Sequence, residues 1–311
     1  MIKPDRENAI WIAAGTVVLL LTILIVFHFY QKHNPAEQLA FKASRVDMIS
    51  RMQLALVMAS EAEKSAVLAT TDRGSQTFAG RARAAAAKVE QERREFGELL
   101  KTGGSSNEKD LFNQFSEYFV EFQRIDNDLL DLAVRNTNVK AYSLAFGPAT
   151  VALEEMNAAL SHLAASNAGS PEEKQVILLA YGAEISSLRL LTLIPPHIAE
   201  ESNRKMDELE ILMSKEDKQI RKNLDELIAL LKPKQNADLM AAVSSYDRFS
   251  KTKTRILALS RENTNIMSLS ISLNQKRKVM LLCQDTLNKL QQAVLEEPLA
   301  GVTYGRPPRP R

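Results

Sequence analysis

Histidine and cysteine, the residues that most often bind metals or act as nucleophiles, are scarce in this sequence, which has four histidines and one cysteine. Di-iron sites in helical bundles use a Glu-x-x-His pattern. None of the histidines fits it, because the residues three positions earlier are Ile25, Tyr30, Ala159 and Ile194. The single cysteine, Cys283, excludes an intrachain disulfide and a C-x-x-C-H haem attachment. The sequence therefore predicts no metal site and no cofactor.

Motifs for nucleotide binding and for hydrolysis are missing as well. Neither G-x-x-x-x-G-K-[ST] nor G-x-S-x-G occurs in the chain. The net charge of +2 provides no global field that would favour nucleic acid. We therefore expect no catalytic residues, no enzymatic activity and no nucleic-acid partner.

Charged residues on the helices offer a few candidates for binding. Glu63 and Glu92 fall on otherwise apolar helical seams, where they could contact a ligand or a cation of a partner. A seam end that reaches solvent, or a buried pair with a nearby arginine, explains them as well, because buried charges are usually paired. A basic run is interpreted as a solvated face; its members are Arg81, Arg83, Lys88, Arg93 and Arg94.

Two Asn-Thr-Asn segments, at residues 136–138 and 263–265, carry side-chain amides that could also bind a ligand. Asparagine and threonine more often cap helix ends, so capping is the alternative role. The complete set of candidate ligand-binding residues is Glu63, Glu92, Asn136, Asn138, Asn263 and Asn265.

The elements that must position these residues begin with an apolar run. No Asp, Glu, Lys or Arg occurs between Glu7 and Lys32. A helix needs about 20 apolar residues to cross a hydrocarbon core of about 30 Å. We therefore predict a transmembrane helix over residues 9–31 that contacts membrane lipid. Trp11 and Tyr30 occupy the positions expected for aromatic residues at the two membrane interfaces.

A cleaved secretory signal is the alternative interpretation of this run. Signal sequences have apolar regions of up to roughly 15 residues and end in a small-x-small site. Here the run ends in the bulky sequence Phe27-His28-Phe29-Tyr30, which favours an uncleaved anchor behind a short polar head, residues 1–8. Basic residues flank the run on both sides, so charge alone does not fix its orientation.

The rest of the chain reads as helix throughout. From Leu111 to Leu132 the apolar residues alternate spacings of four and three, which is the pattern of a left-handed bundle or coiled coil. No alternating apolar and polar run indicates a strand. Breaks are expected at Asp72-Arg73-Gly74 and at Pro195-Pro196, and a kink at Pro148. A capping box at Ser105 and Glu108 should begin one helix.

An internal repeat organises these helices, because Asn263 lies 127 residues after Asn136 and apolar positions coincide at the same offset. Leu160 and Leu163, for example, match Leu287 and Leu290. We interpret the repeat as two copies of a four-helix unit. The predicted fold is all-α: a transmembrane helix, then tandem up-down four-helix bundles over residues 36–166 and 170–297, and a disordered basic, Pro-rich tail, residues 298–311.

A family resemblance comes from the stretch Leu132–Ala149, which contains the first Asn-Thr-Asn, and from Ala62–Leu68. Both resemble the four-helix-bundle ligand-binding domain of methyl-accepting chemotaxis proteins. The resemblance covers residues 10–166 well and residues 172–297 more weakly. It implies a non-catalytic sensor whose body lies outside the bacterial cytoplasmic membrane, in the periplasm, and the predicted helix over residues 9–31 would be its single span. Such a protein would bind a small-molecule ligand or a partner receptor or kinase. The apolar seam from Leu111 to Leu132 favours a homodimer, because such seams also support contacts between bundles.

The sequence departs from that family in one respect. Chemoreceptors have a second span, a linker module and a cytoplasmic signalling hairpin, and none is recognised here. Residues 176–194 are apolar in places, but Glu184 and Arg189 interrupt them. The functional hypothesis is therefore a membrane-anchored, sensor-like binding protein without its own signalling output. The alternative is a structural or accessory subunit, a helical spacer of a membrane complex that binds no small molecule.

Overall fold

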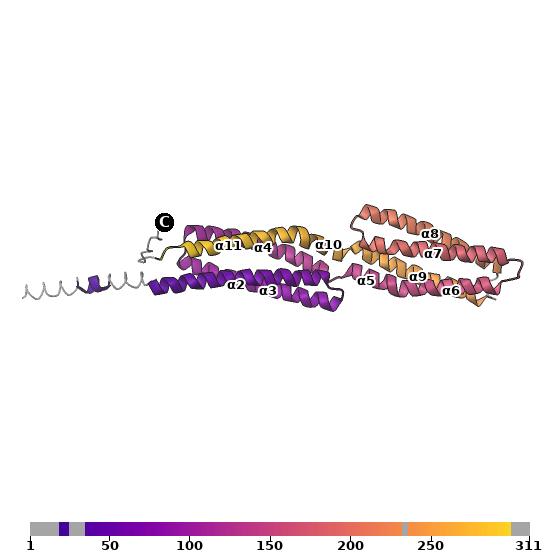
Figure 1. Cartoon of the computed structure of the whole chain (residues 1–311), viewed down its shortest axis with the longest axis horizontal. Helices are drawn as coiled ribbons and strands as arrows, with labels where there is room; N and C mark the ends of the chain where they lie inside the picture. The colour runs from indigo at the N-terminus through magenta and orange to yellow at the C-terminus, as the bar shows by residue number, and fades with distance from the viewer. Residues whose placement is uncertain (1–18, 25–34, 232–235, 300–311) are drawn as a thin grey trace, which may run out of the picture. The chain divides into compact units, whose positions relative to one another are not determined.

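The computed structural model describes residues 19–24, 35–231 and 236–299. Within these ranges the regular secondary structure is entirely helical, so the all-α prediction is confirmed. The proposed interface residues Trp11 and Tyr30, most of the apolar run and nearly all of the tail lie outside the described residues. The helices in chain order (Figure 1) are α2 (Pro35–Leu68), α3 (Asp72–Thr102), α4 (Ser106–Ala133), α5 (Thr137–Leu144), η1 (Ala145–Ala149), α6 (Thr150–Ser166), α7 (Glu173–Ala199), α8 (Asn203–Leu231), α9 (Ala237–Glu262), α10 (Thr264–Ile271), η3 (Ser272–Lys276) and α11 (Arg277–Glu296).

The helices form two compact units. The first unit contains the described residues of Met1–Val57, Ala85–Val120 and Met280–Arg311. The second contains the described residues of Met58–Ala84 and Glu121–Val279. Each unit has its own apolar core, built from the helical faces that the sequence pattern marks as apolar.

The first unit packs four helical segments, from α2, α3, α4 and α11. Lys42 of α2 donates from Nζ to the carbonyl oxygen of Glu297 at 2.8 Å and so caps the end of α11. Gln291 of α11 donates to Ser50 Oγ of α2 at 3.0 Å. The shared core of this unit is fully buried and includes Ile49, Met52, Val89, Phe96, Phe115, Phe119, Leu287 and Leu290.

The second unit contains two groups of packed helices. In one group α6 packs against α7 and α9, and α7 packs against α8. In the other group the end of α2, the start of α3 and the end of α4 share a small core that Ile271 of α10 covers; its buried members are Ala66, Val67, Ala79, Ala82, Leu129, Leu130 and Ala133.

This grouping corrects the predicted consecutive bundles, residues 36–166 and 170–297. The last helix of the first predicted bundle, α6, packs with α7 and α9, whereas α11 packs with α2. The reason is that the chain does not reverse at either Asn-Thr-Asn segment (Figure 1). One left-handed residue, Asn136 (φ 52°) or Asn263 (φ 51°), interrupts each helix, which resumes at the following threonine.

The repeat also accounts for two π-helices. The irregularity predicted at Pro148 takes the form of η1, which contains that proline. A second π-helix, η3, occupies the equivalent place after the second Asn-Thr-Asn segment and contains no proline. Because both copies widen at the same register, the π-helix belongs to the repeated unit and is not a consequence of the proline alone.

Three predicted details can be compared with the helix ends. The capping box is confirmed, because Ser105 Oγ accepts from the backbone N–H of Glu108 at 3.2 Å. The break placed at Asp72-Arg73-Gly74 falls earlier, since α3 begins at Asp72. The predicted stop at Pro195-Pro196 is wrong, because α7 continues through both prolines to Ala199. The two prolines lie near the C-terminal end of α7, which ends three residues after Pro196.

Helix α7 is, among the described residues, long and apolar enough to cross a membrane by length and composition. Its apolar residues are accounted for by packing, since Val176, Ala183, Leu190 and Ile194 are buried in the core of the second unit. Within the predicted transmembrane run, residues 19–24 are helical and their large apolar side chains are exposed.

Candidate functional site

The two Asn-Thr-Asn segments lie side by side in the second unit and form a reciprocal network. The backbone N–H of Asn138 donates to Asn265 Oδ1 at 3.1 Å, and the N–H of Asn265 donates to Asn138 Oδ1 at 3.2 Å. The hydroxyl groups of Thr137 and Thr264 lie 3.2 Å apart, and each accepts from the backbone N–H of the other threonine. The network therefore has an approximate two-fold symmetry that matches the sequence repeat.

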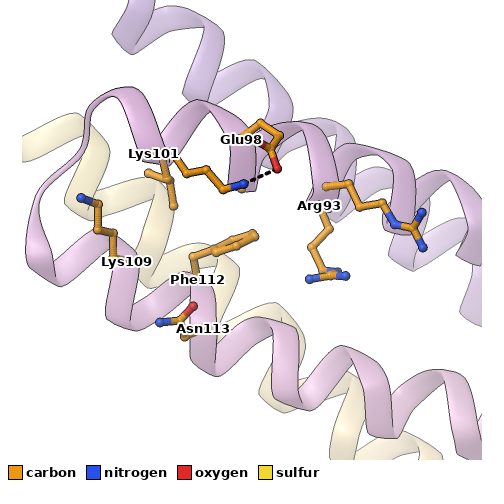
Figure 2. A pocket seen from close by; sticks show the side chains of 9 residues that line it. Arg93, Glu98, Lys101, Lys109, Phe112 and Asn113 are labelled. Atoms are coloured by element: carbon orange, nitrogen blue, oxygen red, sulfur yellow. Dashed lines mark hydrogen bonds and ion pairs between the residues drawn. The ribbon is translucent and has the colours of Figure 1, made fainter.

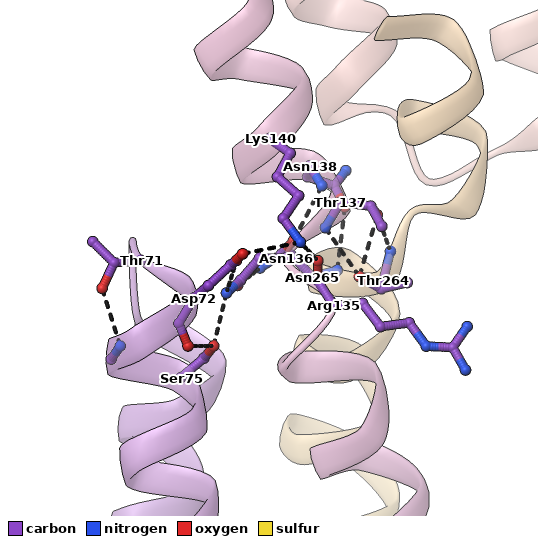
Figure 3. A network of polar contacts seen from close by, with 11 residues as sticks. Thr71, Asp72, Ser75, Arg135, Asn136, Thr137, Asn138, Lys140, Thr264 and Asn265 are labelled. Carbon is purple, nitrogen blue, oxygen red and sulfur yellow. Dashed lines mark hydrogen bonds and ion pairs between the residues drawn. The ribbon is translucent and has the colours of Figure 1, made fainter. Parts of the chain in front are cut away.

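The outer amides of this network hold the ends of other helices. Figure 3 shows Asn136 between Asn265 and the start of α3, where its Nδ2 donates to Ser75 Oγ at 2.7 Å. On the other side Asn138 Nδ2 donates to the carbonyl of Ile198 at 2.8 Å, near the end of α7. Asn263 Nδ2 donates to the carbonyl of Glu200 at 3.1 Å. These four predicted ligand-binding asparagines contact one another, and a ligand role for them stays a prediction. Asn138 and Asn263 bind carbonyls at the end of α7, but Asn136 and Asn263, at the N-caps of α5 and α10, make no side-chain cap hydrogen bond there.

Glu63, a predicted site residue, lies in a second polar cluster of the same unit. Its side chain is 1% exposed, and neither of its carboxylate oxygens has a hydrogen-bond donor in good geometry among the described residues. Nearby, the Lys276 ammonium pairs with Asp126 and lies 3.5 Å from the centroid of the Phe122 ring. Burial raises the pKa of the Glu63 carboxyl, and the adjacent Ser272 hydroxyl and the Lys276 ammonium offset this only in part.

Glu92, the other predicted glutamate, lies in the first unit and is almost completely buried. One of its carboxylate oxygens lies 3.2 Å from Arg51 Nε. The sequence left open a buried pair with an arginine; the pair is present, but the Arg51 side chain is 45% exposed. A ligand role for Glu63 and for Glu92 stays a prediction.

A pocket in the first unit, between α3 and α4, contains residues that the sequence analysis did not select as a site. Its volume is about 640 Å³, within the range of small-molecule sites. Figure 2 shows Phe112 of α4 facing the Glu98–Lys101 ion pair of α3. The lining residues are Arg93, Arg94, Gly97, Glu98, Leu100, Lys101, Lys109, Phe112 and Asn113.

The charges around this pocket are mainly positive. Four of its lining residues are cationic and one, Glu98, is acidic. A second carboxylate, Glu90, accepts hydrogen bonds from both Arg93 and Arg94. The hydrogen bonds from the Arg93 guanidinium hold the pKa of Glu90 below its usual range, so Glu90 is ionised at neutral pH. Because the cations still outnumber the carboxylates, the pocket favours an anion.

A third polar cluster has the composition of a hydrolase triad. His197 Nδ1 lies 2.8 Å from Ser260 Oγ, and His197 Nε2 lies 2.9 Å from Glu210 Oε1. Ser260 and His197 are completely buried, and the serine hydroxyl donates to the carbonyl of His197 at 3.0 Å. A nucleophile must reach its substrate, and the buried Ser260 hydroxyl is not accessible to one. The hydrogen bonds of this cluster instead connect the end of α7 to α9. Among the described residues no group of histidine, cysteine, aspartate or glutamate could hold a metal ion.

The comparison with protein families bears on residues 45–175, which match the four-helix-bundle sensory module for signal transduction. This range contains most of α2, all of α3 and α4, and the segments from α5 to α6. It includes both sides of the pocket between α3 and α4. None of the curated proteins compared with the chain matches it. The resemblance to the four-helix-bundle sensory modules of chemotaxis receptors is therefore confirmed over residues 45–175.

Proposed function

We propose that the protein is a membrane-anchored, extracytoplasmic sensor-like binding protein that recognises a small molecule and catalyses no reaction on it. The observation that carries this proposal is the pocket between α3 and α4, because it lies inside the range that matches a sensory module. The family match supports a sensing role, and a pocket of this size suits a metabolite-sized ligand. The buried Ser260 hydroxyl supports the absence of hydrolytic chemistry.

The tether is the apolar run of residues 9–31, and the body lies outside the cytoplasmic membrane of a bacterium. The exposed leucines and Ile23 on the helical residues 19–24 support this, because exposed apolar side chains are suited to lipid. The side of the membrane can be tested by labelling Asn107→Cys in a Cys283→Ala background with a membrane-impermeant maleimide. Labelling of intact spheroplasts supports an external body, whereas labelling only after permeabilisation contradicts it.

An exposed apolar stripe on α7 supports a protein partner, either a second copy of the chain or a receptor or kinase. Leu178 is 74% exposed, and Tyr181, Ile185 and Leu188 continue the same face at spacings of three and four. Such spacing is typical of helix–helix contacts. The stripe equally favours the second candidate function, an accessory subunit that docks through this face and binds no small molecule.

Calorimetric titration of the full chain in detergent micelles separates the two candidates. The panel contains carboxylic acids, amino acids and amines of metabolite size. Saturable binding of any one compound supports the sensor-like function. Failure of the whole panel, together with purification of a stable complex that Leu178→Asp and Ile185→Asp disrupt, supports the accessory role and overturns the proposal.

A further inference from the structure

We propose that the pocket between α3 and α4 binds an aromatic carboxylate of one or two rings. This inference rests on the proposed function and names the ligand class for the same site. Three features of the pocket carry it: an aromatic floor, a glycine that makes room for that floor, and cations with unused hydrogen-bond donors.

The floor of the pocket is the half-buried ring of Phe112. Its centroid lies 5.4 Å from that of Phe96, which is completely buried and fixes the ring from below. Leu100 adds an apolar wall. Aromatic rings prefer offset-stacked or edge-to-face contacts with other rings, so the open part of Phe112 favours a flat aromatic group over a flexible aliphatic chain.

Gly97 explains how the ring reaches this position. A Cβ atom at residue 97 would lie 3.2 Å from Cε1 and Cζ of Phe112, closer than such contacts normally are. Alanine at this position would crowd the ring and force it to shift by a few tenths of an ångström. The glycine therefore allows the ring to lie against α3 as it does.

The cations at the rim select the charge of the ligand. Lys109 Nζ has no hydrogen-bond or ion-pair partner among the described residues. Arg94 uses Nε to bind Glu90 and leaves both terminal nitrogens without an acceptor in the described part of the chain. Lys101 pairs with Glu98 at 2.6 Å and lies opposite Phe112 in Figure 2. The open N–H groups of the Arg94 guanidinium can bind a carboxylate with two parallel hydrogen bonds, and the Lys109 ammonium adds positive charge to the rim.

The test is calorimetric titration of the full chain in detergent with benzoate and 2-naphthoate. Benzylamine has the same ring with the opposite charge, cyclohexanecarboxylate has the same charge without the aromatic ring, and inorganic phosphate supplies an anion alone. We expect benzoate and 2-naphthoate to bind, cyclohexanecarboxylate to bind more weakly, and benzylamine and phosphate not to bind.

The variants locate the site. Arg94→Ala should weaken aromatic carboxylate binding about tenfold, because it removes charge-assisted hydrogen bonds. Lys109→Ala should weaken it less, because it removes a positive charge from the rim. Phe112→Leu should remove the preference for an aromatic ring, and Gly97→Ala should weaken 2-naphthoate more than benzoate. Lys88→Ala, which removes an exposed α3 lysine outside the pocket, is the matched control and should leave binding unchanged. A thermal unfolding midpoint equal to that of the unmodified chain shows that each variant is folded.

The outcomes separate this inference from the proposed function. Binding of an aromatic carboxylate that the Lys109, Arg94 and Phe112 variants leave unchanged places the ligand elsewhere, so the inference fails and the sensor-like function stands. Binding of benzylamine or of phosphate at the same residues overturns the ligand class. If aromatic carboxylates fail while another compound of the wider panel binds, only this inference is lost. If nothing binds, this inference is lost, and a stable complex that Leu178→Asp and Ile185→Asp disrupt then overturns the sensor-like function as well.

Discussion

The substitution Lys276→Met removes the cation from the buried cluster of the second unit. Lys276 and Asp126 are almost completely buried, and the ammonium also lies over the Phe122 ring. Methionine fills a similar volume and keeps a favourable contact with the ring. The main effect is therefore electrostatic, because Asp126 and Glu63 remain in a site that holds no other cation of comparable burial among the described residues.

The expected loss is about 3–5 kcal/mol of unfolding free energy, the usual cost of removing one partner from a buried ion pair. For a unit of this size that loss lowers the unfolding midpoint by about 10 °C. The assay is thermal unfolding of the full chain in detergent, followed by circular dichroism at neutral pH. The control is the double variant Lys276→Met/Asp126→Leu, in which no ion pair is left to break.

The double variant should recover most of the lost stability, because replacing a buried ion pair by apolar residues is often neutral or stabilising. A loss below about 1 kcal/mol for Lys276→Met would place the ammonium in water, since exposed pairs contribute that little. A double variant no more stable than the single one would show that packing, and not charge, explains the loss. Either result would refute the reasoning.

Three further predictions concern the second unit and are read from unfolding midpoints or denaturant titrations. The pKa of Glu63 is raised in the folded chain, so this carboxyl's contribution to stability is present at pH values below the ordinary pKa of about 4.5 and is lost as pH rises through the folded pKa. Glu63→Gln should abolish that loss. If the variant leaves the pH dependence of the unfolding midpoint unchanged, the burial of the charge is contradicted. Asn138→Ala should cost about 1–3 kcal/mol because it leaves buried polar groups without partners, whereas the exposed Asn274→Ala should cost under about 0.5 kcal/mol; equal costs would argue against the network. His197→Ala should cost about 2–4 kcal/mol through a cavity and two lost hydrogen bonds, while the exposed His162→Ala should be near neutral, and the reverse order would refute the buried position.

The apolar faces of the helices could be predicted from the sequence, because buried residues recur there at helical spacing. The seam from Leu111 to Leu132 is α4, and its central residues Phe115, Phe122 and Leu129 are completely buried. The repeat at an offset of 127 residues was also visible, and the hydrogen bonds between Thr137 and Thr264 now give it a physical meaning.

The sequence did not indicate whether the chain reverses or continues in the same direction at each Asn-Thr-Asn segment. Asparagine is common both at helix caps that precede a reversal and as a single left-handed residue within a continuing path. Asn136 and Asn263 take the second role, and nothing local distinguishes the two. The direction of the chain at these residues decides which helices become neighbours. Because the sequence analysis assumed a reversal at each segment, it assigned α6 and α11 to the wrong groups of helices.

The pocket escaped prediction for a different reason. Arg93 and Arg94 are close to Glu90, and their spacing is that of an ordinary solvated helix face. Phe112 comes from a separate helix, so its contact with α3 depends on packing that the sequence does not state. The available signal was Gly97 inside a helix, since a mid-helix glycine often marks a close approach of another side chain.

The grouping of the helices is the central claim about the fold, and short-range thiol cross-linking between α2 and α11 tests it most directly. Ser50→Cys with Gln291→Cys places thiols at a pair that shares a hydrogen bond of 3.0 Å. The matched control joins Ser50→Cys to Ala164→Cys, the residue equivalent to Gln291 in the repeat, which the core of the second unit buries; both pairs are made in a Cys283→Ala background. We expect efficient cross-linking of 50 to 291 and none of 50 to 164. The reverse result would restore consecutive bundles and contradict the fold described here.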